Sequence, residues 1–423
     1  MQYINKDLGS FNLHMINTDK FKTITVSVVF HTPIIKEEIT MRNVLSDMLL
    51  QSSKNYKSKR ELTIKAEELY ACDISTGNQR IGNYIFTSFS LQALKDHYTE
   101  IGNLDKSLEF LSEIIYKPDV NKNKFNEEKL QIVKHNSQVV LDSIKEKANS
   151  YSIIRLKETY DKDSPISYRM MGYQEDLNKI DGENLYKYYE KMIDNDYVDI
   201  FVVGDFDYKE MTLLIKKYFK FKKIKKRKSS YYLNNPLIHN RKITSRESID
   251  NTQSKLSILC PLLKLTDYEK KYPMVLANII LGGTPDSMLF KEVREKNSLC
   301  YTVRSQYNKF DNTILIMAGI DKDNYTKTVD VTTKVLQKLK KGHFTDTDIK
   351  NAKEYYNTSI EEIESKPGNI ISEYLACSVL GGDFLEERLV KMNKVTKRQI
   401  IRAAKKIKLD TIFLLEGVKN EKN

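Results

Sequence analysis

Two side chains in the second half of the sequence have the types and spacing needed to stabilise a negatively charged oxygen. Arg294 and Tyr301 are seven residues apart, in the segment LGGTPDSMLFKEVREKNSLCYTV from Leu281 to Val303. A guanidinium and a phenol that face one cavity can both donate hydrogen bonds to the oxyanion that develops on a peptide carbonyl. The residues alone leave an alternative open, in which Arg294 pairs with Glu292, Glu295 or Asp286 on the surface and Tyr301 packs in a sheet. They also do not say whether the two side chains share a cavity.

The pattern around this pair predicts the elements that must hold it. A Gly282-Gly283-Thr284 loop comes first, and its glycines can leave backbone N–H groups exposed. A short helix from Met288 to Lys296 follows, with its apolar residues on one side, and a strand is expected to begin at Cys300. Arg294 and Tyr301 therefore lie on either side of a helix-to-strand junction.

The histidines do not form a zinc motif. There are six of them, and no two lie within five residues of each other. Two zinc ligands on one helix must be one turn apart to reach the same ion, so HExxH and HxxEH motifs are excluded. The sequence also contains no GxSxG elbow, Walker loop or GxGxxG. The chain by itself shows no hydrolytic centre, and we expect it to bind no metal.

Composition indicates a globular protein with room for two cores. The chain has 423 residues, of which 40% are hydrophobic and 30% charged. The net charge of +12 could attract nucleic acid, but the basic residues are spread along the chain and mixed with Asp and Glu. Lys6 and Asp7 lie where a signal peptide would need an apolar run, and no run of 18 apolar residues follows. We expect a cytoplasmic protein that does not enter a membrane.

The order of strands and helices recurs in the two halves. In the first half, we expect strands at Phe11 to Met15 and Thr23 to Phe30, two helices, two more strands, helical periodicity from His97 to Glu158, and a strand at Val198 to Val203. The corresponding strands of the second half are expected at Ser254 to Cys260, Thr313 to Ile320 and Thr411 to Gly417. This repetition predicts an α+β fold made of two homologous domains.

A basic segment separates the two halves. The run KKYFKFKKIKKRK from Lys216 to Lys228 is the densest cluster of charge, and Pro236 and several Asn and Ser residues follow it. We interpret residues 219–244 as an exposed linker with solvated charges, between one domain of residues 1–218 and another of residues 245–423. The run lacks the Gly-aromatic signature of an RNA-binding module, so we do not expect nucleic-acid binding.

The segment around Arg294 also resembles a known family. SMLFKEVREKNSLCYTV is similar to the C-terminal-domain signature of the pitrilysin/insulinase-like metallopeptidases, the inverzincins, in which a Gly-rich loop precedes SxLFxxVREKxxLxY. The resemblance covers most of the chain, including the duplicated α/β roll, the linker and the FVVGDFD strand at Phe201 to Asp207. In that family an Arg and a Tyr at this separation bind substrate and stabilise the transition state, which implies these roles for Arg294 and Tyr301. Gly282 and Gly283 would form the substrate-binding wall beside them.

The sequence departs from this family at the metal site. Active members carry HxxEH on the first helix of the first domain, whereas this chain reads NVLSDMLL. Asn43, Ser46 and Asp47 thus replace the first His, the Glu base and the second His. Glu127 and Glu128 lie near the position of the third ligand, but a lone carboxylate cannot hold catalytic zinc. The resemblance implies a degenerate zinc motif and no cofactor on this chain.

A chain that loses zinc but keeps the Arg and Tyr resembles one half of the two-subunit members of the family. The whole-chain pattern, including Ser152 to Ile180, is similar to the bacterial subfamily associated with aminopentanol modification of elongation factor P. The resemblance implies that the chain is inactive alone and forms a heterodimer with a homologous HxxEH-containing subunit, which carries the zinc and cleaves a peptide substrate. Two alternatives stay open: a structural pseudo-peptidase that contributes no active-site group, and a basic RNA-binding protein.

Overall fold

The computed structural model describes residues 1–224 and 230–418, which form two compact units. The first unit comprises Met1–Asp142, Arg169–Ser229 and Glu364–Ala376. The second comprises Ser143–Tyr168, Ser230–Ile363 and Cys377–Asn423. Each unit has its own sheet and its own hydrophobic core. The part of the basic run at residues 225–228 lies outside the described residues.

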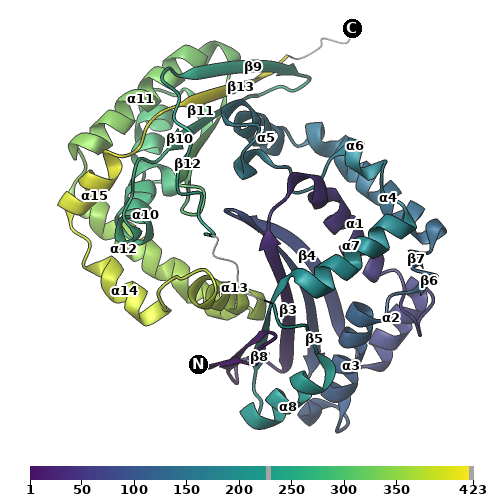
Figure 1. The fold of residues 1–423 in the computed structure, drawn as a ribbon. Coiled ribbons are helices and arrows are strands. Elements are labelled where there is room, and N and C mark those ends of the chain that lie inside the picture. The colour runs from purple at the N-terminus through teal and green to yellow at the C-terminus, as the bar shows by residue number, and fades with distance from the viewer. Residues whose placement is uncertain (225–229, 419–423) are drawn as a thin grey trace. The chain divides into compact units, whose positions relative to one another are not determined.

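A six-stranded mixed sheet organises the first unit, in the order β1-β2-β8-β3-β5-β4 (Figure 1). Its strands are β1 (Gln2–Asp7), β2 (Asn12–Asn17), β3 (Thr23–Pro33), β4 (Asp73–Ile81), β5 (Tyr84–Leu94) and β8 (Tyr197–Gly204). β2 and β8 run parallel, and the other neighbouring pairs are antiparallel. β3 is central and buried over most of its length, because its β-branched and aromatic residues suit a strand that is covered on both faces.

Helices cover the face of this sheet that carries Val26, Val28 and Phe30. They are α1 (Ile39–Leu49), α2 (Lys59–Glu68), α3 (Asn103–Tyr116), α4 (Glu127–Asp142), α6 (Gln174–Leu177), α7 (Gly182–Asn195) and α8 (Tyr208–Tyr218), and a small hairpin of β6 (Val120–Asn121) and β7 (Lys124–Phe125) precedes α4. Asp181 caps the start of α7 and Asp207 caps the start of α8, each accepting hydrogen bonds from backbone N–H groups that the helix leaves unpaired.

The second unit repeats this topology with five strands, in the order β11-β12-β10-β13-β9. Its strands are β9 (Ile243–Ile249), β10 (Ser254–Pro261), β11 (Cys300–Asn308), β12 (Thr313–Ile320) and β13 (Thr411–Gly417). β9 and β13 run parallel, and the other pairs are antiparallel, as in the matching strands of the first sheet. Its helices include α9 (Asp267–Lys271), α10 (Pro273–Asn278), α11 (Tyr325–Lys341), α12 (Asp346–Glu361), α14 (Leu385–Asn393) and α15 (Lys397–Ala404). This agreement confirms the predicted duplicated α+β fold.

Each unit also contains a helix taken from the other half of the sequence. α5 (Ala148–Tyr160) packs on the second sheet (Figure 1). The hydroxyls of Ser152 and Ser257 lie 2.8 Å apart, and Leu156 joins a core cluster with Phe413. α13 (Pro367–Ser378) belongs mainly to the first unit, in which the ring of Tyr374 lies 4.7 Å from that of Tyr3. The expected linker at residues 219–244 would place α5 in the first domain and α13 in the second. The structure places α5 in the second unit and most of α13 in the first.

Candidate functional site

The glycine loop is held tightly against an edge strand of the second sheet. A π-helical segment, η5 (Ile279–Gly283), follows α10 and ends in the two glycines. A Cβ on Gly282 would lie 2.7 Å from the backbone N of Ser305 and 2.8 Å from its Oγ, so only glycine allows this approach to β11. Ser305 Oγ also donates a hydrogen bond of 3.2 Å to the carbonyl of Asn278. The loop is therefore fixed to the strand that begins just after Arg294.

Arg294 lies near the end of a second π-helical segment, η6 (Phe290–Glu295). Its guanidinium carbon is 4.7 Å from the centre of the Phe290 ring, and the side chain is exposed. Glu292, one of the three acids considered as an alternative partner, instead pairs with Lys338 at 2.9 Å. In the part of the chain that the structure describes, Arg294 forms no ion pair. Its hydrogen-bonding capacity is available to a ligand.

Tyr301 lies on a bulge at the start of β11. Cys300 pairs with Ile320 and Thr302 with Gly319, so Tyr301 is the extra residue between two regular pairs. Its side chain is 59% exposed rather than packed in the sheet. Burial raises the pKa of the Cys300 thiol to about 11 against the opposing positive charge of Arg294, which indicates that the guanidinium lies near the start of this strand.

A cavity of about 450 Å³ opens beside Arg294, wholly within the second unit. We call it the Arg294 cavity, and its lining includes Lys255, Gly282, Gly283, Arg294, Thr302 and Arg304. The structure thus brings the two predicted glycines and Arg294 into one wall, whereas Tyr301 is not among the described residues that line it. Arg304 and Lys255 were not predicted from the sequence. The alternation of β11 is the signal that could have indicated Arg304, since it puts Thr302 and Arg304 on one face.

The degenerate zinc-motif positions lie on α1 in the first unit, and their side chains take part in structural contacts. Asn43 Nδ2 donates to the carbonyl of Met170 at 2.6 Å, and Ser46 Oγ donates to the carbonyl of Arg42 at 2.8 Å. Ser46 Oγ also accepts a hydrogen bond of 3.0 Å from Asn78 Nδ2 on β4. Asparagine and serine offer neither imidazole nor carboxylate, so these positions do not fit a catalytic zinc ion.

A buried ion pair anchors α1 next to these positions. Arg42 Nη2 lies 2.5 Å from Asp196 Oδ2, and both side chains are almost completely buried. The same guanidinium donates to Tyr188 Oη and to Thr87 Oγ1, each at 3.0 Å. All its donors therefore point into the protein, as a buried arginine requires.

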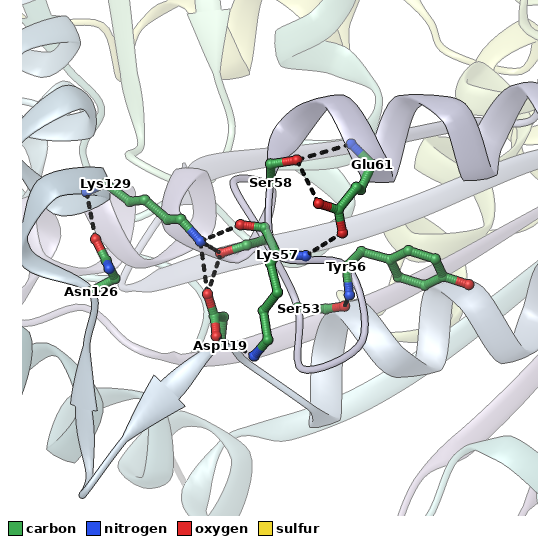
Figure 2. A network of polar contacts seen from close by, with 9 residues as sticks. Ser53, Tyr56, Lys57, Ser58, Glu61, Asp119, Asn126 and Lys129 are labelled. Carbon is green, nitrogen blue, oxygen red and sulfur yellow. Dashed lines mark hydrogen bonds and ion pairs between the residues drawn. The ribbon is translucent and has the colours of Figure 1, made fainter.

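Asp47, at the position of the second histidine, lines a different cavity of about 640 Å³. Burial raises the pKa of its carboxyl group, and the nearby Lys59 opposes that shift. The loop after α1 is tied to the start of α4 by Lys129, whose ammonium lies 2.7 Å from Asp119, while Lys57 reaches the other oxygen of Asp119 at 2.6 Å (Figure 2). These contacts hold the segment that follows α1.

Among residues 1–224 and 230–418, no three His, Cys, Asp or Glu side chains are grouped so that they could hold a metal ion. Within the same ranges, no helix combines the length and the apolar character that crossing a bilayer demands.

Comparison with known proteins adds independent information on the family. A family model described as the peptidase M16 inactive domain matches residues 179–356. Over 99% of both chains, the sequence is 29% identical to the probable inactive metalloprotease YmfF of Bacillus subtilis (strain 168). It is 24% identical, over 69% of each chain, to the uncharacterized zinc protease YmxG of the same strain. The solved structure of a conserved protein from Enterococcus faecalis V583 is 29% identical and covers 99% of both chains with a TM-score of 0.91.

The family match, the relatives and the repeated sheet topology agree with one another and with the signature around Arg294. They confirm the resemblance drawn from the sequence: residues 179–356 match the inactive domain of the peptidase M16 family, and nearly the whole chain is similar to a probable inactive metalloprotease.

Proposed function

We propose that this chain is the zinc-less subunit of a two-chain peptidase and that it contributes Arg294 and Tyr301 to peptide hydrolysis. The observation that carries the proposal is that Arg294, without an ion pair among the described residues, lines the same cavity as Gly282 and Gly283. A guanidinium that no neighbouring acid neutralises can stabilise negative charge that develops on a substrate.

In this proposal the chemistry is divided between two polypeptides. The partner carries HxxEH and holds the zinc, the attacking water and the general base. Arg294 donates N–H hydrogen bonds to the carbonyl oxygen as it becomes an oxyanion, and the phenol of Tyr301 donates another. Gly282 and Gly283 form the wall against which the peptide lies.

The relatives support a partner of this kind. One bacterial strain encodes both a relative named as a probable inactive metalloprotease and a relative named as a zinc protease. An inactive chain and a zinc-bearing chain of one family in one cell are the two components that the proposal requires. The replacement of zinc ligands at Asn43 and Asp47 explains why this chain would not suffice alone.

The test is cleavage of a quenched fluorescent peptide by this chain mixed with its zinc-bearing homologue. Arg294→Ala should lower kcat by about 10²- to 10³-fold, the usual loss when one oxyanion donor is removed, and Tyr301→Phe should also lower it. Arg398→Ala removes an exposed arginine from α15 and should leave the rate unchanged. If Arg294→Ala and Tyr301→Phe both support cleavage at the wild-type rate, the proposal is wrong.

A structural pseudo-peptidase is the second candidate, and the placement of Tyr301 favours it. Tyr301 is exposed on a bulge and does not line the Arg294 cavity, so the two side chains are not organised as a preformed pair. A scaffold subunit would stabilise its zinc-bearing partner without changing the chemistry. In the same assay, this candidate predicts that the wild-type chain and both variants raise the activity of the partner equally.

A further inference from the structure

The Arg294 cavity has an unusual balance of charge. Lys255, Arg294 and Arg304 all line it, and no Asp or Glu is among its described lining residues. Glu292, two positions before Arg294, is paired with Lys338 at 2.9 Å. Three positive groups thus share one opening with no internal partner to neutralise them.

The register of the sheet explains why these groups converge. Gly319 on β12 pairs with Lys255 on β10 and with Thr302 on β11, so these three residues form one row across the sheet. Met317 forms the next row on the same face, between Ser257 and Arg304. Because Gly319 has no side chain, the amide of Gln253 lies over the middle of this row, and a Cβ on Gly319 would be only 2.7 Å from Gln253 Oε1.

The positive groups that line the Arg294 cavity have few polar partners within the chain. Lys255 Nζ donates to the amide oxygen of Gln253, and burial lowers the pKa of the Lys255 ammonium. Arg294 has its contact with the Phe290 ring, and Arg304 forms no ion pair in the described part of the chain. Like charges that share a partly enclosed space repel each other, and a bound anion would remove this repulsion and gain charge-assisted hydrogen bonds.

We propose that the Arg294 cavity binds a carboxylate of a peptide, and that Arg304 and Lys255 determine this specificity. The planar fork of Arg304 matches the two oxygens of a carboxylate. Ile153, Phe290 and Met317 supply apolar surface for the aliphatic part of the same residue. A cavity of about 450 Å³ is large enough for one or two residues of an extended peptide. The carboxylate can come from an acidic side chain or from a peptide C-terminus, since both present the same group.

The inference rests on the proposed function only because it takes the ligand to be a peptide. Peptide binding to the whole chain, measured without the partner subunit, tests the inference. Four fluorescent peptides of one sequence are compared by anisotropy, with Glu or Gln at one central position and with a free or an amidated C-terminus. Removing the recognised carboxylate should weaken binding at least tenfold. The Glu-to-Gln change then identifies an acidic side chain, whereas amidation identifies the C-terminus.

Arg304→Gln and Lys255→Gln should each reduce this preference, and the double variant should abolish it. Arg398→Gln is the matched control, because it removes one exposed positive charge elsewhere in the second unit and should keep the full preference. Thermal unfolding of each variant verifies that it is folded. Inorganic phosphate should compete only at concentrations far above that of the peptide.

Three results would overturn the inference: equal binding of all four peptides, no binding of any peptide at millimolar concentration, or a preference that survives the double variant. Competition by phosphate at the peptide's own concentration would also overturn it, because the site would then be a simple anion site. The proposed function fails separately, when Arg294→Ala and Tyr301→Phe both leave cleavage with the zinc-bearing partner unchanged. The binding and cleavage assays therefore distinguish the two failures.

Discussion

Replacing Gly282 with alanine tests the close packing between the glycine loop and β11. The new Cβ would lie 2.7 Å from Ser305 N, 2.8 Å from Ser305 Oγ and 2.9 Å from Leu289 Cδ1. Ser305 cannot yield easily, since its backbone is paired with Ile316 in the sheet. Overpacking of this kind destabilises a protein by about 1–3 kcal/mol. In a unit of this size, each kcal/mol lowers Tm by about 2–4 °C.

Gly283→Ala is the matched control for this prediction. Its Cβ would lie 3.4 Å from the carbonyl oxygen of Asn278 and 3.5 Å from Ile279, which are ordinary contacts. Neither Gly282 nor Gly283 has a positive φ, so backbone strain does not distinguish the two substitutions. Calorimetry measures both variants, and Gly282→Ala should lower the transition of the second unit more than Gly283→Ala does. Equal Tm values for the two variants would refute the reasoning.

Two further predictions concern buried charges of the first unit. Arg42→Met leaves the carboxylate of Asp196 buried without its partner and should lower the free energy of unfolding by about 3–5 kcal/mol in urea denaturation; a loss below about 1 kcal/mol would contradict this. Burial alone would raise the pKa of Asp199, but hydrogen bonds from His14 and His31, each 2.8 Å long, lower it well below its ordinary value. A lowered pKa means that this carboxylate stabilises the fold at neutral pH and stops doing so as acid protonates it. The stability difference between wild type and Asp199→Asn should therefore shrink as the pH falls below about 4, and a difference that stays constant from neutral pH to about 3 would argue against it.

The central strands could be predicted from the sequence almost to the residue. β12 (Thr313–Ile320) and β13 (Thr411–Gly417) have the expected bounds, because strands that are buried on both faces appear as unbroken apolar runs. The edge strands were harder to recognise. β1 (Gln2–Asp7) was not predicted, and β9 (Ile243–Ile249) begins inside the expected linker, because each is half exposed and rich in polar residues.

The helical stretch from His97 to Glu158 is interrupted in the structure. α3, α4 and α5 are separate helices, and the hairpin of β6 and β7 lies between the first two. That hairpin turns at Lys122 and Asn123, both with positive φ. Hydrophobic periodicity does not detect a turn of two residues. It also does not indicate that α5 belongs to the second unit, whereas α3 and α4 belong to the first.

The candidate site could be predicted only in part. Gly282, Gly283 and Arg294 are close in sequence, so one motif indicated all three, and the structure places them in one cavity wall. Arg304 and Lys255 lie on different strands and meet only through the register of β10, β11 and β12. That register depends on long-range pairing, and no local residue pattern encodes it. The bulge that holds Tyr301 outside the cavity lining has no signal in the sequence either.

The exchanged helix α13 has a consequence for the order in which the protein can be completed during synthesis. The first unit needs residues 364–376, yet its preceding segment ends at residue 229. At about 5–20 residues per second, the ribosome needs roughly 7–27 s to make the intervening stretch. Until then the sheet near Tyr3 and His14 lacks the helix that carries Tyr374. The nascent chain therefore has a period in which part of its first sheet is uncovered and open to chaperones or to aggregation.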